Sequence, residues 1–157
     1  MTDETISADA DAAGITRGAR RVLYDLGYDS LTEFQFRTGR RADIMALNQG
    51  GEIVVVEVKS SVADFRSDAK WPEYLDWCDA LFFAVASGFP AAILPPDQGL
   101  IVCDAYGGEV LRDARRAKLP AARRKMLTLR FGLVAARRLQ GFVDEAGTGR
   151  RRPVTIA

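Results

Sequence analysis

The feature that most constrains this chain is a short apolar run that leads directly into charged residues. Ile53–Val56 is followed by Glu57, Val58 and Lys59. Four consecutive β-branched residues predict a strand that is covered on both faces, as in an α/β sheet with helices on either side. An ionised carboxylate in such a strand is costly unless another group compensates it. The run therefore predicts a layered α/β fold, and it marks Glu57 as a residue that needs an explanation.

The chain before this run has the spacing of one helix followed by strands. Apolar residues at helical intervals predict an amphipathic helix that ends at Gly27 and packs its apolar stripe on a sheet. Gly50 and Gly51 mark a tight turn, so the segments on either side of this turn are predicted to form a hairpin. The helix is predicted at residues 15–26, and the strands at residues 31–36, 42–47 and 53–60.

The second half of the chain is predicted to add three strands and more helix. Polar residues after Ser61 and the proline at position 72 predict a helix over residues 63–78 that is broken near Trp71. Apolar runs predict strands at residues 80–86, 100–104 and 109–111. A long helix is predicted over residues 120–143. Its apolar face is predicted to consist of Leu119, Ala122, Met126, Leu129, Leu133 and Ala136.

Length and composition predict one domain with two tails. The chain has 157 residues, 48% of them apolar, which suffices for one buried core but not for two ordinary domains. Residues 1–14 carry four acidic side chains and no basic one, which predicts a flexible acidic tail rather than a signal peptide. Residues 147–157 contain Arg150, Arg151 and Arg152 beside glycines and predict a flexible basic tail. A single domain is predicted at residues 15–146.

The histidine and cysteine content narrows the possible chemistry. The chain has no histidine, which excludes Ser-His-Asp and Cys-His nucleophilic sites as well as histidine-bound zinc. Cys78 and Cys103 lie far apart in the sequence, and we expect two buried free thiols. No apolar run approaches the roughly 18 residues of a membrane span, so we expect a cytoplasmic protein without a membrane partner. Any catalysis must therefore use carboxylates, lysine or a hard metal ion.

Charge is unevenly distributed, although the net charge is only +1. Residues 1–111 carry 9 basic and 18 acidic side chains, whereas residues 112–157 carry 13 and 3. A basic last third on an acidic body is typical of a protein that binds the phosphate backbone of a nucleic acid, and a solvated helix face has a similar composition. Arg123, Arg130 and Arg137 flank the apolar face of the predicted long helix and are candidate nucleic-acid contacts.

Three charged residues on two neighbouring strands form the candidate site. Side chains alternate along a strand, so Glu57 and Lys59 project to the same face, roughly 6.6 Å apart. The predicted hairpin brings Asp43 beside Glu57. Two carboxylates together with phosphate oxygens from a substrate match the ligand preference of Mg²⁺ or Mn²⁺. The alternative is an ordinary ion pair between Glu57 and Lys59 at a sheet edge, with Asp43 as a turn residue.

Such a site is suited to phosphodiester hydrolysis without histidine. The metal ion would polarise the scissile phosphate and lower the pKa of its bound water. Lys59 would face the bound phosphate, where it orients that water or stabilises the developing negative charge. The predicted catalytic residues are therefore Asp43, Glu57 and Lys59, and the predicted metal ligands are Asp43 and Glu57.

This pattern resembles a known superfamily and, more narrowly, a known family. The chain resembles the PD-(D/E)XK nucleases, whose core has the order α-β-β-β-α-β. The resemblance rests on Asp43, a hairpin and Glu57-Val58-Lys59, with one helix before them and one after. More narrowly, the chain resembles the MmcB-like bacterial DNA repair proteins. This resemblance rests on four strings: Gly-Arg-Arg-Ala-Asp at 39–43, Val-Glu-Val-Lys-Ser-Ser at 56–61, Asp-Phe-Arg at 64–66 and Lys-Trp-Pro-Glu-Tyr at 70–74. The likeness spans residues 15–140. It implies a mixed sheet flanked by helices, with DNA as the partner.

The resemblance also implies a third carboxylate. Many relatives have a glutamate in the first helix, where Asp25 is the only acidic residue of the predicted helix in this chain. Glu33 is the better substitute, because it shares one face of the predicted strand with Leu31 and Gln35. It is a candidate third metal ligand and is the fourth of the predicted catalytic residues. The alternative is a solvent-facing glutamate on an edge strand.

Residues around the site are candidate contacts to DNA. Lys70 follows the predicted catalytic strand and is placed to meet a backbone phosphate. Arg40 and Arg41 fit phosphate contacts and equally fit a role in balancing the carboxylates. Trp71 and Trp77 are predicted to belong to the core.

Three functions are compatible with these patterns. The leading hypothesis is a Mg²⁺- or Mn²⁺-dependent DNA endonuclease-like repair protein whose basic C-terminal helix helps to hold DNA. The second is a catalytically silent nucleic-acid-binding module with the same fold. The third is a protein-interaction factor in which residues 150–152 bind an acidic partner. A homodimer is compatible with each of them.

Overall fold

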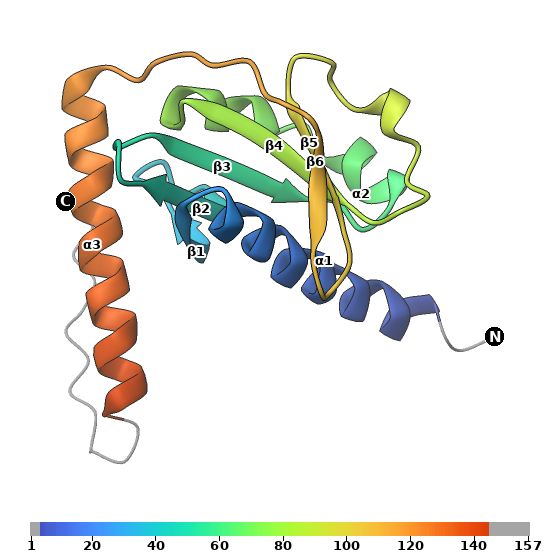
Figure 1. Cartoon of the computed structure of the whole chain (residues 1–157), viewed down its shortest axis with the longest axis horizontal. Helices are drawn as coiled ribbons and strands as arrows, with labels where there is room; N and C mark the ends of the chain where they lie inside the picture. The colour runs from blue at the N-terminus through green and yellow to red at the C-terminus, as the bar shows by residue number, and fades with distance from the viewer. Residues whose placement is uncertain (1–3, 145–157) are drawn as a thin grey trace.

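One six-stranded mixed sheet with helices on both faces forms the core of the chain (Figure 1). The computed structural model describes residues 4–144, with side chains from residue 12 onward. Within that part, no helix is both long enough and apolar enough to cross a membrane. The elements are α1 (Glu4–Asp25), β1 (Tyr28–Gln35), β2 (Arg41–Asn48), β3 (Ile53–Val58), α2 (Val62–Ser67), the 3₁₀ helix η1 (Trp71–Trp77), β4 (Ala80–Val85), the 3₁₀ turn η2 (Ala91–Ile93), β5 (Gly99–Cys103), β6 (Gly108–Arg112) and α3 (Ala121–Val143).

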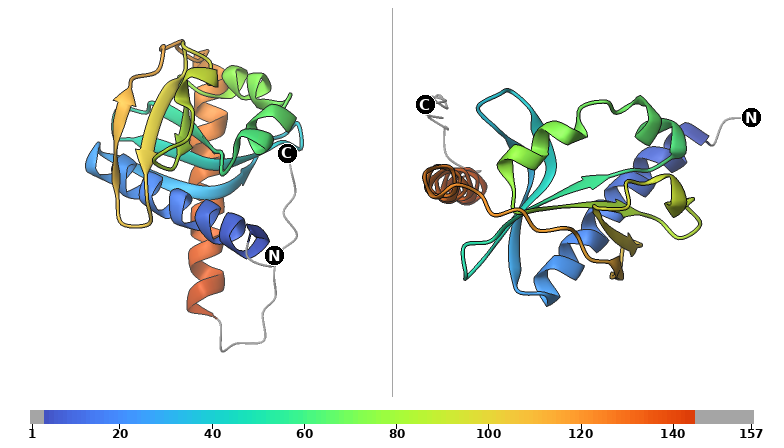
Figure 2. Two further views of the ribbon diagram at one scale, coloured as in Figure 1. Left: turned by 90° about the vertical axis from the view of Figure 1, so that its right-hand side faces the viewer. Right: turned by 90° about the horizontal axis from the view of Figure 1, so that it is seen from above.

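The sheet keeps its strands in chain order from β1 to β6. The first three strands pair antiparallel, β3, β4 and β5 are parallel, and β6 returns antiparallel to β5. Helix α1 lies along one face of the sheet, and α2 and η1 lie on the other (Figures 1 and 2). Every residue of β3 and of β4 is buried. The unbroken apolar run of β3 is thus explained by cover on both faces, as the sequence predicts.

The two faces of the sheet carry separate hydrophobic cores. On the α1 side, Ile15 and Leu23 pack against strand residues such as Ile44 and Val56. On the opposite side, the core is rich in aromatic residues. Its largest fully buried members are Phe34, Phe36 and Phe83. Trp71 and Trp77 pack on this second core, which confirms their predicted core role.

The predicted hairpin between β2 and β3 is confirmed. Gly51 turns the chain with a φ of +80°, in the left-handed region that a residue without a Cβ adopts at no steric cost. Its N–H donates to the carbonyl of Asn48 over 3.0 Å. The other strands and the break near Trp71 lie close to the predicted positions.

The first helix begins much earlier than predicted. It starts at Glu4, whereas the sequence pattern predicts a start at Ile15, so most of the predicted acidic tail is helical backbone. Alanine is the strongest helix former, and acidic residues near a helix N-terminus interact favourably with the helix dipole, which explains the extension. The predicted basic tail, residues 147–157, lies outside the described residues.

The predicted apolar face of the last helix is confirmed at Leu119 and Met126, which pack on the second core, and is wrong further along the helix. Leu129 and Leu133 belong to that predicted face, yet they are 60% and 56% exposed. The side chains that pack on the sheet are Met126, Leu127, Phe131 and Val134. Helix α3 carries two apolar stripes, and periodicity alone does not tell which of them meets the body.

An ion pair between half-buried Arg124 and buried Asp79 fixes the start of α3 to the sheet. The Asp79 carboxylate accepts hydrogen bonds from Arg124 at 2.5 and 2.7 Å, and from the N–H groups of Ile53 at 2.8 Å and Leu119 at 2.9 Å. Arg124 also donates to the carbonyl of Gly51. Burial alone would raise the pKa of Asp79, but these hydrogen bonds outweigh it and hold the pKa below its usual range.

Candidate active site

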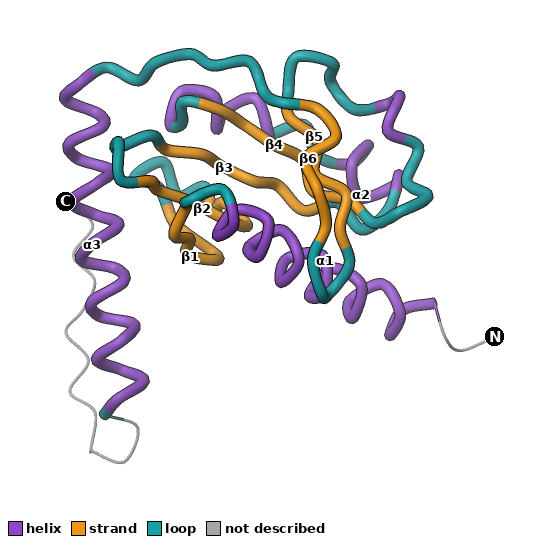
Figure 3. Tube along the Cα trace, in the orientation of Figure 1, coloured by secondary structure: helices purple, strands orange, loops and turns teal. Residues whose placement is uncertain are grey.

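The candidate site lies where β2 begins and β3 ends, beside the loop that leads into α2 (Figure 3). The hairpin register pairs Ile44 with Val56, and one step further it sets Asp43 opposite Glu57. Val56 and Val58 face the α1 core, so Glu57 between them projects to the α2 side of the sheet. The predicted meeting of the two carboxylates is therefore confirmed.

Each of these two carboxylates accepts a backbone hydrogen bond from across the hairpin. Asp43 Oδ2 accepts the N–H of Val58 over 2.8 Å. Glu57 Oε1 accepts the N–H of Asp43 over 3.3 Å. Each acid is thus held by the backbone of the strand that carries the other. The arrangement leaves little freedom for either side chain to move away.

Burial and mutual repulsion raise the proton affinity of both acids. Glu57 is only 5% exposed. Burial first, and then the negative charge of Asp43, raise the pKa of Glu57 to about 8. Burial also raises the pKa of Asp43, against the opposing hydrogen bond from Val58. Near neutral pH the pair is suited to holding a proton or, in its place, a cation.

Lys59 is buried next to these acids but pairs with a different partner. It is 5% exposed, and its Nζ donates to Asp68 Oδ2 over 2.6 Å. Asp68 Oδ1 accepts the N–H groups of Lys70 and Trp71 at 2.8 and 3.1 Å. Burial alone would raise the pKa of Asp68, but the hydrogen bonds from Lys59 and Lys70 lower it. The ion pair expected between Glu57 and Lys59 under the alternative interpretation is not the one in the structure.

Asp68 is a site residue that sequence reasoning missed. It is the C-cap of α2, and its side chain returns to Lys59 because α2 is only six residues long. No spacing rule links the two positions, since the length of the intervening helix decides their contact. A cap signal for the start of α2 is nevertheless present in the sequence. Ser61 accepts the N–H of Asp64 over 3.0 Å, and the Asp64 carboxylate accepts the N–H of Ser60 over 3.1 Å.

Glu33 lies across from Asp43 but outside the buried site. The pairs on either side of it, Thr32 with Ile44 and Phe34 with Ala42, set Glu33 opposite Asp43. Its side chain is 60% exposed and pairs with Arg41 at 3.0 Å. Its φ of 52° is unusual for a residue other than glycine, and backbone of this kind concentrates at functional sites.

The candidate phosphate contacts near the site differ in how they are paired. Arg40 forms an ion pair with Glu73 at 2.5 Å, and Arg41 forms the pair with Glu33 already described. Lys70 is exposed, and its ammonium group forms no ion pair with another described residue. Of these three cations, Lys70 is the one whose charge is not already offset.

Two of the three candidate arginines on α3 serve to hold that helix in place. Arg123 donates to the carbonyl of Asp76 over 2.7 Å and stacks on Trp77 with its guanidinium 4.8 Å from the ring centroid. Arg130 donates to the carbonyl of Gln35 over 2.8 Å. Arg137 is exposed. Helix α3 therefore offers fewer free cations than its sequence suggests.

The donor set fits a small divalent cation with two protein ligands. Among the described residues, no three acidic or cysteine side chains come together as a metal site. Asp43 and Glu57 supply two neighbouring carboxylates, and Mg²⁺ is commonly held in proteins by one or two carboxylates plus water and substrate phosphate. The raised pKa values of both acids also favour a bound cation, because a cation relieves the repulsion between the two carboxylates.

Comparison with known proteins gives one family and one solved structure. A family model described as "DNA repair protein MmcB-like" matches residues 2–146. The solved structure of the SPO1766 protein of unknown function from Silicibacter pomeroyi is 46% identical to the chain, with a TM-score of 0.85. The match covers 90% of this chain and 97% of that one. No curated protein gives a significant match.

Proposed function

The chain belongs to the MmcB-like family of DNA repair proteins, and on that premise we propose that it is a metal-dependent, endonuclease-like DNA repair protein of the cytoplasm. We assign it a PD-(D/E)XK core. The order α1-β1-β2-β3-α2-β4 supports this assignment, because it has the α-β-β-β-α-β sequence of that core. The observation that carries the proposal is the adjoining pair of half-buried Asp43 and buried Glu57, with the pKa of Glu57 raised to about 8.

In this proposal Asp43 and Glu57 hold Mg²⁺ or Mn²⁺. When bound, the ion polarises the scissile phosphate and supplies an activated water at neutral pH. Lys59 contributes a buried positive charge two residues from Glu57, directed to the same face of β3. It stabilises negative charge that develops on the phosphate. Glu33 is proposed as an outer carboxylate that reaches the site only if its pairing with Arg41 is released.

DNA binding is proposed to rest on the cations around the site and on α3. Lys70 and Arg137 are exposed and are assigned direct phosphate contacts. Arg40, Arg41, Arg123 and Arg130 are assigned weaker ones, because each already has a partner in the protein. Binding of this kind weakens steeply as salt rises, because phosphate contacts release counterions.

The test compares cleavage and binding in Lys59→Ala. Labelled single-stranded, double-stranded and branched DNA are incubated with Mg²⁺ or Mn²⁺, and binding is measured separately by fluorescence anisotropy. We expect cleavage to fall by about 100-fold or more while binding persists. Lys118→Ala, which removes an exposed lysine outside the site, is the matched control and should cleave normally. Undiminished cleavage in Lys59→Ala would contradict the proposed mechanism.

A catalytically silent DNA-binding module remains the second candidate. The ion pair of Lys59 with Asp68 favours it, because this contact engages the lysine inside the protein. The number of carboxylates also favours this candidate. Among the described residues, no third acidic side chain joins Asp43 and Glu57 to complete a metal site with three carboxylate ligands. Salt-sensitive DNA binding without cleavage by the unaltered protein, in either metal, would select this candidate.

A further inference from the structure

Helix α3 carries an apolar stripe that faces away from the sheet. Its members Leu129, Leu133, Leu139 and Val143 are 60%, 56%, 64% and 74% exposed. At about 100° per residue they fall within an arc of about 120° on the helix, on the side away from the packed residue Leu127. We call these four residues the outer stripe. Figures 1 and 2 show the later turns of α3 extending beyond the sheet.

This stripe lacks a partner within the described part of the chain. Leu127 is the one fully buried residue of α3, and all of residues 136–143 are exposed. A helix gains most of its stability from packing an apolar face, so an unpacked final half is marginal in water. Extended exposed apolar surfaces on folded proteins mark interaction sites.

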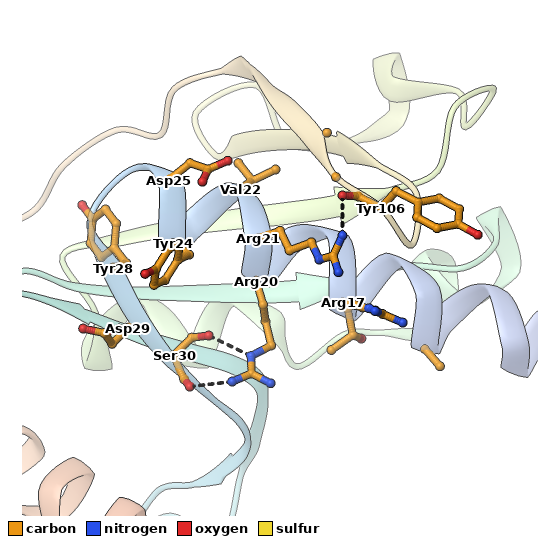
Figure 4. A pocket seen from close by; sticks show the side chains of 14 residues that line it. Arg17, Arg20, Arg21, Val22, Tyr24, Asp25, Tyr28, Asp29, Ser30 and Tyr106 are labelled. Atoms are coloured by element: carbon orange, nitrogen blue, oxygen red, sulfur yellow. Dashed lines mark hydrogen bonds between the residues drawn. The ribbon is translucent and has the colours of Figure 1, made fainter.

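A second exposed apolar surface lies at the corner where α1 passes into β1. Tyr24 and Leu26 are 71% and 57% exposed there, next to the exposed acids Asp25 and Asp29. We call these four residues the α1–β1 corner. Three of them line a groove of about 630 Å³, and Figure 4 shows the two carboxylates at one end of it.

Three arginines line the part of that groove along the middle of α1. Arg20 donates to the hydroxyl and the carbonyl of Ser30 at 2.9 and 3.0 Å, and Arg21 donates to the carbonyl of Tyr106 at 3.0 Å (Figure 4). Arg17 lies beside them. The groove is therefore basic along the middle of α1, and its two acidic side chains, Asp25 and Asp29, lie at the corner with Tyr24.

The outer stripe and the corner are complementary in charge. Lys125 lies on the same side of α3 as the stripe, and α3 contains no acidic residue. Among the described residues, neither Lys125 nor the corner acids Asp25 and Asp29 form an ion pair. One surface is apolar and basic, and the other is apolar and acidic.

We propose that two copies of this chain pair about a two-fold axis, with the outer stripe of α3 in each copy covering the α1–β1 corner of the other. Each chain carries both surfaces, so one symmetric pairing covers all four of them. Lys125 then meets the acids of the corner. The interface involves neither Asp43 nor Glu57, and the proposal is independent of DNA cleavage.

The first test is the mass of the full chain in solution. Sedimentation velocity should give a dimer for the unaltered protein and a monomer for the double variant Leu133→Asp/Leu139→Asp, because each aspartate is forced into the apolar contact. Leu111→Asp is the matched control, since Leu111 is 58% exposed on β6 and belongs to neither surface. It should remain dimeric, and circular dichroism checks that every variant is folded. A monomeric unaltered protein would overturn the proposal.

The second test identifies which surfaces meet. Asp29→Lys and Lys125→Asp should each weaken the dimer by about 10-fold in Kd, and the two changes together should restore it. Dimers that are lost in the leucine double variant yet unchanged by Asp29→Lys would show that the outer stripes pair with each other, which overturns the proposed contact. If the unaltered chain is monomeric and the leucine double variant binds DNA less tightly than Leu111→Asp, the stripe serves DNA binding and the dimer is again ruled out.

Discussion

Asp79 and Glu57 are two buried carboxylates at opposite ends of the parallel strands, and their environments differ in kind. They are 6% and 5% exposed. Asp79 stands just before β4, where Arg124 and two backbone N–H groups satisfy both of its oxygens. Glu57 stands near the end of β3, where it accepts one long hydrogen bond and faces the like charge of Asp43.

The pKa values of the two acids record that difference. Hydrogen bonds and the charge of Arg124 outweigh burial at Asp79 and lower its pKa, whereas burial and Asp43 raise the pKa of Glu57 to about 8. Burial of a charge is therefore not in itself a sign of function. A buried charge that its surroundings fail to compensate is the better indicator, because folding gains nothing from it.

Removal of the compensated acid should give the largest effect. Asp79→Ala leaves Arg124 and the N–H groups of Ile53 and Leu119 without their acceptor, at the point where α3 joins the sheet. We expect the free energy of unfolding to fall by about 3–5 kcal/mol in urea denaturation. Asp97→Ala, which removes an exposed carboxylate, should change it by less than about 0.5 kcal/mol. If both changes lowered the free energy of unfolding equally, the proposed structural role of Asp79 would be contradicted.

Neutralising the uncompensated acid should act in the opposite direction. The folded-state pKa of Glu57, about 8, lies above its ordinary value of 4.5. The stabilisation that protonated Glu57 gives the folded chain is therefore complete below pH 4.5 and is lost as the pH rises through about 8. Without added metal, the unaltered protein should lose on the order of a few kcal/mol between pH 5 and pH 8.

The variant that tests this is Glu57→Gln. It should lose most of that pH dependence, be more stable than the unaltered protein at pH 8, and fail to cleave DNA. Thermal unfolding across the pH range measures the effect. Glu109→Gln, an exposed isosteric change, should keep the original slope. A slope that is the same in both variants would show that Glu57 is compensated after all.

The smallest effect extends the contrast from acids to cations. Lys70 is exposed and unpaired within the described residues, whereas Arg40 is bound to Glu73. Lys70→Ala should weaken DNA binding by several-fold and reduce the slope of log affinity against log salt by about 1. Arg40→Ala should do less, because Glu73 already offsets its charge. Fluorescence anisotropy titrations at three salt concentrations distinguish the two variants, and a larger loss for Arg40→Ala would reverse the assignment.

The hairpin and its acids were predictable because they depend on local pattern. The strand at Ile53–Val58 follows from its unbroken β-branched run, and the turn at Gly51 and the meeting of Asp43 with Glu57 follow from a short hairpin loop. The ion pair of Lys59 with Asp68 did not follow, because it depends on where α2 stops. The ion pairs of Arg40 with Glu73 and of Arg41 with Glu33 could not be predicted either. The first joins segments far apart in the sequence, and the second joins exposed side chains of two neighbouring strands.

The sequence by itself determined the sheet with two covered faces and the three residues at its β2–β3 end. Strand period, glycine turns and the cost of a buried carboxylate depend on neighbouring residues, and the sequence alone shows them. Only the tertiary structure decided which stripe of α3 packs, which buried acid is compensated, and which cations are already paired. Those outcomes depend on contacts between residues far apart in the chain, and periodicity carries no information about them.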